Sequence, residues 1–192
     1  MIQDYLSPLP EELDQLRKSL PKPTVGGQVD WFSDFKQCDL GGYRVALIGV
    51  QEERHAVDNE GCSLGVNLVR ECWYKLFKGT WDFPLLDLGN IRAGATVADT
   101  YFALKEVVSH LVGHGVIPII IGGSQDLTFA QYRAYESLEQ LVNLTVVDTN
   151  FDIGDPEYRI DSKSYMNKII LQKPNILFNY TNLAYQSFFV DP

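Results

Sequence analysis

The stretch from 117 to 152 constrains the fold most strongly, because it holds two apolar runs that each end in polar residues. Ile117–Ile121 is almost entirely apolar and ends at a double glycine, and the second run, Leu144–Val147, ends at Asp148. The segment between the two runs has the length and pattern of a helix. Nearly continuous apolar runs are typical of parallel strands that are covered on both faces. The stretch therefore predicts a strand–helix–strand unit in a parallel α/β sheet.

Polar side chains follow both predicted strands. Open α/β sheets bind their ligands in the crevice beyond the carboxyl ends of the strands. The candidate site is therefore formed by the polar residues that follow the two runs, which are Ser124, Gln125, Asp126, Asp148, Asn150 and Asp152. His55 lies in the polar loop 51–61 and is the histidine best placed to reach this edge. Two interpretations of His55 stay open: a solvated loop residue, or a ligand or acid/base.

These polar motifs resemble those of a known family. Gly122–Asp126 and Asp148–Asp152 look like the Gly-Gly-Asp-His and Asp-Ala-His-x-Asp motifs of the ureohydrolases, the arginase, agmatinase and formimidoylglutamase group. The resemblance extends over roughly residues 42–154. It implies an arginase-like, three-layer αβα fold with a mostly parallel, doubly wound sheet. The family's sheet needs more strands than 192 residues provide, which is consistent with an incomplete, amino-terminal portion of a longer protein.

The resemblance also implies a set of metal ligands. Active members hold two manganese ions through histidines and aspartates of both motifs and through two aspartates of a later motif. Asp148 and Asp152 match retained ligand positions, whereas Gln125 and Asn150 stand where the family has its two histidines, and no third motif appears before Pro192. Manganese binds weakly among the divalent transition metals, so its sites depend on the number and geometry of ligands. We therefore expect no bound cofactor, with Mn²⁺ as the metal if the site is functional.

The two amides suggest how the carboxylates could be accommodated without a metal. Neighbouring carboxylates repel each other, and the repulsion raises the pKa of one of them. Side-chain amide NH₂ groups can donate hydrogen bonds to carboxylates. Our hypothesis is that Gln125 and Asn150 donate to Asp148 and Asp152 in the place of metal ions.

Three functions are compatible with these residues. The one we favour is a ureohydrolase-family protein that has lost its binuclear manganese centre and acts as a non-catalytic binding or structural protein. The first alternative is an active metal-dependent hydrolase of a linear amidine C–N bond, on a guanidino or formimino substrate, with a rearranged site. The second is a small-molecule-binding α/β domain with unrelated chemistry. A nucleotide ligand is disfavoured because the chain has neither a G-x-G-x-x-G motif nor a P-loop lysine.

Composition excludes several classes of partner. A net charge of -9 and a pI near 4.7 disfavour nucleic-acid binding, which requires a basic face. No apolar run is long enough to cross a bilayer, and the first residues lack the pattern of a signal peptide, so we expect a cytoplasmic protein without membrane contact. Cys38, Cys62 and Cys72 are an odd number without metal-type spacing, which favours free thiols.

The chain divides into an amino-terminal arm, residues 1–42, and an α/β domain, residues 43–192. The arm contains an expected helix at 10–20 and is expected to lie outside the sheet. Its aromatic residues Trp31, Phe32 and Phe35 are expected to pack on their own domain, or on a neighbouring subunit of a homo-oligomer.

Alternating patterns predict the elements of the α/β domain. The predicted strands are 43–50, 83–88, 117–121, 144–148 and 174–178, and the predicted helices are 63–77, 96–114, 126–141 and 162–171. Ser63, Thr96 and Ser162 are the expected first residues of three helices. The inward face of helix 63–77 is expected to carry Leu64, Leu68, Cys72 and Leu76. His110 and His114 could bind a metal on one helix face, but capping of the helix end by His114 is favoured.

Overall fold

The computed structural model describes residues 2–31, 40–155, 157 and 159–189. In chain order its elements are η1 (Ile2–Tyr5), β1 (Leu6–Ser7), α1 (Glu11–Ser19), β2 (Asp30–Trp31), η3 (Leu40–Gly42), β3 (Val45–Val50), η4 (Cys62–Leu64), α2 (Gly65–Tyr74), β4 (Leu85–Ile91), α3 (Val97–Gly113), β5 (Ile117–Ile121), α4 (Leu127–Ser137), β6 (Val142–Val147), α5 (Tyr165–Leu171) and β7 (Leu177–Leu183).

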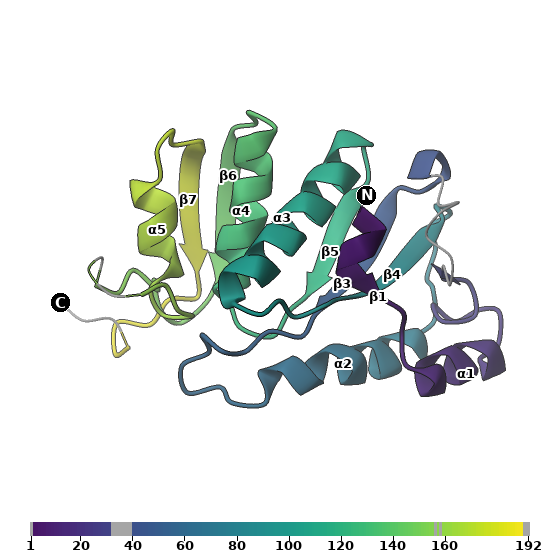
Figure 1. The fold of residues 1–192 in the computed structure, drawn as a ribbon. Helices are drawn as coiled ribbons and strands as arrows, with labels where there is room; N and C mark the ends of the chain where they lie inside the picture. The colour runs from purple at the N-terminus through teal and green to yellow at the C-terminus, as the bar shows by residue number, and fades with distance from the viewer. Residues whose placement is uncertain (1, 32–39, 156, 158, 190–192) are drawn as a thin grey trace.

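The strands form two separate sheets (Figure 1). The larger has the order β1-β4-β3-β5, with β2 also paired to β4, and every pairing in it is parallel except that of β1 with β4. The smaller contains β6 and β7, which are parallel. The predicted mostly parallel α/β fold is confirmed, while the expected single sheet is interrupted between β5 and β6.

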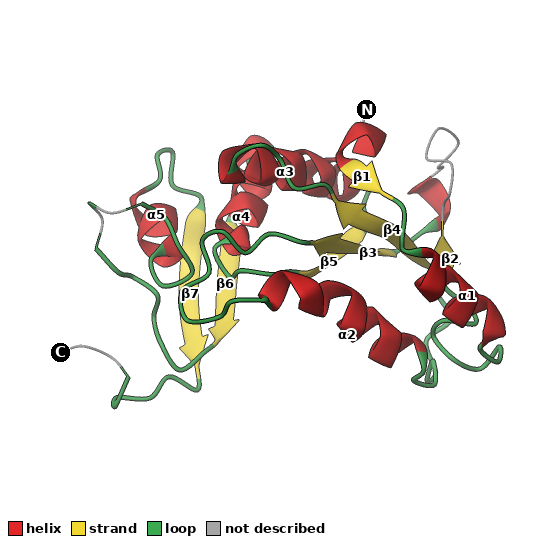
Figure 2. Ribbon diagram, turned by 60° about the horizontal axis from the view of Figure 1, so that its bottom comes forward, coloured by secondary structure: helices red, strands yellow, loops and turns green. Residues whose placement is uncertain are grey.

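Helices cover both faces of the larger sheet. Figure 2 shows α3 on one side of β3, β4 and β5, and α2 on the other. One core cluster joins the sheet to α3 and α4, and its fully buried members include Ile48, Leu86, Leu88, Leu104, Val108, Leu111 and Ala130. A second cluster joins α4 and α5 to the smaller sheet through Tyr132, Tyr165, Met166 and Ile169. Among the described residues, no helix combines the length and the apolar character needed to span a bilayer.

The buried face of α2 differs from the predicted one. Leu64, Leu68 and Leu76, which were expected to point inward, are exposed, and so is Cys72. The helix instead buries Val66, Arg70 and Tyr74. The prediction was wrong because it relied on the spacing of apolar residues, and such spacing places an arginine on the face of the helix that is exposed to solvent. Ser63 is not the helix cap either: its backbone N–H and its hydroxyl both donate to the carboxylate of Glu53.

Arg70 is buried because partners on β4 satisfy its guanidinium. Its Nε donates to Asp87 Oδ2 at 2.9 Å, and its NH2 donates to Asp87 Oδ1 at 3.1 Å and to the carbonyl of Gly89 at 2.7 Å. Its NH1 donates to Asn90 Oδ1 at 2.6 Å, and the hydroxyl of Tyr74 donates to Asp87 Oδ2 at 2.7 Å. Arg70 and Asp87 are both fully buried. This cluster fixes α2 against the central strand of the sheet.

The amino-terminal segment contributes to the sheet. Leu6 and Ser7 pair with Ile91 and Asn90 of β4, and β2 pairs with the other end of β4. The expectation that residues 1–42 lie outside the sheet is therefore wrong. Gly89 makes the pairing with β1 possible, because it has φ +76° and a Cβ there would lie 2.3 Å from the carbonyl oxygen of Ser7.

The aromatic residues expected in the arm are only partly described. Trp31 packs against a cluster that contains Leu9, Leu13, Val25 and Tyr74, whereas Phe32 and Phe35 lie outside the described residues. Cys38 also lies outside them. Trp31 is thus partly buried against residues of its own chain.

The predicted ends of α3 are confirmed, whereas the predicted start of the last helix is wrong. Thr96 caps α3 through a capping box in which Thr96 Oγ1 accepts the N–H of Asp99, and the carboxylate of Asp99 accepts the N–H of Thr96. His114 follows the last turn, and its Nδ1 lies 2.7 Å from the carbonyl of His110, as expected for capping. The last helix begins at Tyr165 and not at Ser162, whose hydroxyl instead accepts the N–H of Val57 at 2.9 Å.

The Arg70 cluster leads to a prediction about stability. Removing one partner of a buried ion pair leaves the other charge without compensation, so we expect Arg70→Ala to lower the free energy of unfolding by about 3–5 kcal/mol. Lys75, one turn further along, forms an exposed pair with Glu71 at 2.8 Å. Lys75→Ala is the matched control and should change stability within experimental error. Urea denaturation of both variants tests this, and equal effects would contradict it.

Candidate functional site

The predicted site residues gather beyond the carboxyl ends of β5 and β6. Five of the seven line one pocket, namely Ser124, Gln125, Asp148, Asn150 and Asp152. The rest of the pocket wall comes from Gly123 after β5, from loop 51–61 through Ala56, Val57 and Asn59, and from the segment before α5 through Ser162 and Lys163. Sequence reasoning placed the loop at this edge but missed Ser162 and Lys163, for which no motif gave a signal.

Loop 51–61 is held against the double glycine by backbone contacts. The N–H of Ser124 donates to the carbonyl of Glu52 at 2.9 Å. A Cβ at Gly123 would lie 2.2 Å from that same carbonyl oxygen, so only glycine allows this approach. Burial alone would raise the pKa of Glu52, but hydrogen bonds from Arg54 and Thr100 lower it to about 2. The ionised Glu52 thereby anchors the loop that forms one wall of the pocket.

Gln125 and Asn150 point to partners other than the aspartates. Gln125 Nε2 donates to the hydroxyl of Tyr165 at 3.2 Å. Asn150 Nδ2 donates to Thr149 Oγ1 at 3.2 Å, and only its backbone N–H donates to Asp148 Oδ1, at 3.0 Å. The hypothesis that the two side-chain amides neutralise Asp148 and Asp152 is therefore wrong. Tyr165 and Thr149 are nearer partners that sequence spacing did not reveal.

Asp152 occupies an unfavourable environment for a carboxylate. Its side chain is 8% exposed, its backbone is in the left-handed region at φ 51°, and its Oδ2 has no hydrogen-bond partner in the protein. Burial, together with the nearby charges of Asp148 and Asp161, raises the pKa of Asp152 to about 6, although Lys163 acts in the opposite direction. Lys163 itself forms an ion pair with Asp58. The pocket therefore holds a carboxyl group that titrates near neutral pH.

Asp126 and His55 lie behind the pocket. Asp126 is fully buried and accepts hydrogen bonds from the hydroxyls of Ser124 and Tyr101. His55 Nδ1 lies 3.3 Å from the hydroxyl of Tyr101 and 3.8 Å from Asp126 Oδ2. Burial lowers the pKa of His55, and burial together with the bond to Asp126 raises the pKa of Tyr101. His55 is thus a largely buried residue of the supporting network, and neither a solvated loop residue nor part of the pocket wall.

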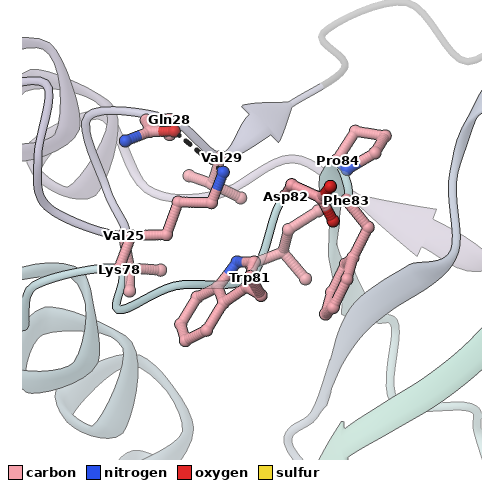
Figure 3. A pocket seen from close by; sticks show the side chains of 9 residues that line it. Val25, Gln28, Val29, Lys78, Trp81, Asp82, Phe83 and Pro84 are labelled. Carbon is pink, nitrogen blue, oxygen red and sulfur yellow. Dashed lines mark hydrogen bonds between the residues drawn. The ribbon is translucent and has the colours of Figure 1, made fainter.

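A second hollow lies near the amino end of β4, away from these residues (Figure 3). The rings of Trp81 and Phe83 stack there with centroids 6.1 Å apart, and Lys78 Nζ donates to Gln28 Oε1 at 3.0 Å. None of the predicted site residues lines it. The carboxyl edge of the strands is therefore where a pocket contains the predicted carboxylates Asp148 and Asp152.

The donor set at this edge does not fit a pair of manganese ions. Across the described ranges, no three His, Cys, Asp or Glu side chains come together in a way that could hold a metal ion. Asp148 and Asp152 supply carboxylates, and Gln125 and Asn150 can supply only neutral amide oxygens. No chemical step through a metal can be assigned to these residues.

Comparison with known proteins identifies the family. The Arginase family model matches residues 43–181, which is most of the chain. The chain belongs to the arginase family. A formimidoylglutamase from Geobacillus sp. (strain WCH70) is 24% identical over 139 residues, covering 68% of this chain and 43% of that protein.

Solved structures show the same fold as this arginase-family chain. The formimidoylglutamase of Bacillus subtilis superposes with a TM-score of 0.73 at 15% identity, covering 85% of this chain and 53% of that one. The formiminoglutamase of Trypanosoma cruzi, solved with Mn²⁺, gives a TM-score of 0.69 at 19% identity, covering 82% and 57%. This arginase-family chain therefore spans only about half the length of these relatives.

The raised pKa of Asp152 predicts a pH-dependent contribution to stability. Because the folded-state pKa, about 6, exceeds the ordinary value of 3.8, the folded protein holds this proton more tightly than the unfolded chain. The contribution of protonated Asp152 to the stability of the folded protein is complete below pH ~4, and it is lost as the pH rises through about 6. Asp152→Asn should therefore raise the free energy of unfolding by about 1–3 kcal/mol at pH 8 and by much less at pH 4.

Denaturant unfolding of the wild type and of Asp152→Asn at both pH values measures this difference. Asp155→Asn, which removes an exposed carboxylate from the same loop, controls for the loss of one charge. A gain in stability that is the same at pH 4 and pH 8 would show that the carboxyl of Asp152 is not perturbed.

Proposed function

We propose that this arginase-family, formimidoylglutamase-like chain has lost the binuclear manganese centre and acts as a non-catalytic binding or structural protein. The observation that carries the proposal is the orientation of the two residues at the substituted histidine positions. Gln125 turns its amide NH₂ to Tyr165 and Asn150 turns its amide NH₂ to Thr149, so each position offers a metal at most a neutral amide oxygen in place of an imidazole nitrogen. The pocket, with its acidic side chains, persists at the family's functional edge as a small-molecule site.

The chemistry of the donors supports this proposal. A side-chain amide offers a metal only a neutral carbonyl oxygen, whereas imidazole nitrogen is a good ligand for divalent transition metals. Two carboxylates alone do not enclose two ions. The relative of known structure with Mn²⁺ is 19% identical to this chain, which is too distant to transfer its metal.

One observation favours a second candidate function. Asp152 Oδ2 is buried in the pocket wall without a protein hydrogen-bond donor, and buried polar atoms normally have a partner. A single cation at this oxygen would satisfy it. The second candidate is therefore a metal-dependent hydrolase of a guanidino or formimino C–N bond that works with a rearranged site.

Manganese retention separates the two candidates. We expect the wild-type chain to retain no manganese after incubation with excess Mn²⁺ and desalting, as measured by elemental analysis. The double variant Gln125→His/Asn150→His restores imidazoles at both positions and should bind Mn²⁺ at least tenfold more tightly than the wild type. Gln125→Ala/Asn150→Ala controls for the loss of the amide hydrogen bonds and should bind no better than the wild type.

Manganese bound by the wild type through its two aspartates would be the opposite result. Near-stoichiometric manganese in the wild type that disappears in Asp148→Ala/Asp152→Ala would contradict the loss of the metal centre. Hydrolysis of a guanidino or formimino substrate by the same sample would then establish the second candidate.

A further inference from the structure

Two histidines at the end of α3 have no part in the candidate site. His110 lies in the last turn of the helix, and His114 follows its final residue, Gly113. Four positions separate the two histidines, so their side chains are neighbours on one face of the helix. They lie where the chain leaves α3 and approaches the start of β5, whereas the pocket with Ser124 lies beyond the end of that strand. The pair and the pocket are therefore at opposite ends of β5.

The two imidazole rings are close enough to share one ion. Their centroids are 4.3 Å apart, and their planes are inclined at 47°. Bonds from zinc to imidazole nitrogen are about 2.0–2.1 Å long, so two rings that bind the same ion have centroids about 4.5–5 Å apart. The observed separation is slightly shorter than this. Small rotations of the side chains would therefore admit an ion.

A backbone contact fixes which nitrogen of His114 carries the proton. Nδ1 of His114 lies 2.7 Å from the carbonyl oxygen of His110. A carbonyl oxygen only accepts hydrogen bonds, so Nδ1 must donate, and in the neutral ring Nε2 then has a free lone pair. Metal-binding histidines usually have this arrangement, because the hydrogen bond orients the ring and makes the other nitrogen a better ligand. Capping of the helix and binding of a metal are thus compatible roles for His114.

The backbone also holds His114 in place. The carbonyl of His110 accepts the backbone N–H of His114 at 3.2 Å as well as its ring N–H. Gly115, with φ +74°, then turns the chain away from the helix. A side chain that is already ordered loses little conformational entropy on binding, which favours affinity. His114 is therefore a preorganised ligand.

The ring of His110 is available as the second ligand. In the described part of the chain this ring contacts the ring of His114 and has no hydrogen bond. Both histidines are exposed, which leaves room for an ion and its water ligands. No third His, Cys, Asp or Glu side chain of the described residues joins them. Water would therefore occupy the remaining positions around the ion.

The end of the helix adds a favourable electrostatic contribution. The last carbonyl groups of an α-helix carry a partial negative charge, which stabilises cations within the last turn. α3 is 17 residues long, and the two histidines lie at this end of it. An ion held by both rings would lie beside that charge.

We propose that His110 and His114 form a chelating site for a borderline divalent transition ion of the class of Zn²⁺, Ni²⁺ and Cu²⁺. Imidazole nitrogen suits these ions, and the affinity of a nitrogen site rises from Mn²⁺ to Cu²⁺. Manganese is the weakest ion of this series, so the manganese measurement that tests the proposed function does not probe this site. The proposal therefore stands or falls independently of the chemistry at Asp148 and Asp152.

Calorimetric titration with NiCl₂ tests the proposal on the full chain without an affinity tag. We expect the wild type to bind one Ni²⁺ per chain. His110→Gln and His114→Gln each remove one ligand nitrogen and should weaken binding at least tenfold. Thermal melts of both variants without metal establish that they are folded, as the exposure of the two side chains predicts.

A spacing variant is the matched control. Glu106→His/His110→Gln keeps the number of histidines at three and keeps the pair on the same face of α3. It separates the pair by eight residues, which is about 12 Å along the helix, so no single ion can contact both rings. This variant should bind Ni²⁺ at least tenfold more weakly than the wild type. Asp148→Ala/Asp152→Ala leaves the histidine pair intact and should bind Ni²⁺ like the wild type.

Nitrogen-15 NMR of the imidazole rings, with diamagnetic Zn²⁺ as the probe, identifies the ligand atoms. We expect Zn²⁺ to shift the Nε2 resonance of His114 while its Nδ1 stays protonated, and to shift one nitrogen of His110. The ring of His55, which lies beside the hydroxyl of Tyr101, should not respond.

Three results would overturn the proposal. The first is the absence of Ni²⁺ binding by the wild type, and the second is binding that the spacing variant retains at full strength. The third is binding that persists in His110→Gln and disappears in Asp148→Ala/Asp152→Ala, which would assign the ion to the pocket.

Discussion

The buried ion pair between Arg70 and Asp87 is the interaction on which the rest of the structure depends. Asp87 lies in the middle of β4, the strand that pairs with β1, β2 and β3, and Arg70 lies on the inner face of α2. A guanidinium can be buried only where fixed acceptors replace its water, and Asp87, Gly89 and Asn90 of β4 provide them. Strand β4 thereby sets the position of the helix, and the loop before the helix reaches the pocket.

Contacts within the protein hold the pocket in shape at the edge beyond β5 and β6. The double glycine allows the close approach of loop 51–61, and Asp148 and Asp152 line the pocket. The amide of Gln125 is stabilised by Tyr165 from α5, which lies far away in sequence. Asp152, with no such partner, is left buried with a raised pKa. The environment of Asp152 therefore disfavours the charged form of its carboxyl group.

Sequence reasoning succeeded where a local pattern determines the structure. The apolar runs predicted β3 and β5, the start of α3 was predicted at Thr96, and the polar residues after β5 and β6 do meet in one pocket. It failed where a distant partner decides the outcome. Arg70 is buried because of Asp87, seventeen positions away, and Gln125 turns to Tyr165, forty positions away. The pairing of residues 6–7 with β4 likewise has no signature in so short a strand.

The interruption in the sheet changes how the pocket should be understood. Parallel strands are ordinarily enclosed on both sides, and here the two strands that carry the site residues are each open on the side that faces the other. The pocket walls are therefore formed by loop 51–61, by the turns after β5 and β6 and by the segment before α5, and not by a continuous row of strand ends. The geometry of the pocket consequently depends on the contacts that hold these loops, such as the bond from the N–H of Ser124 to the carbonyl of Glu52.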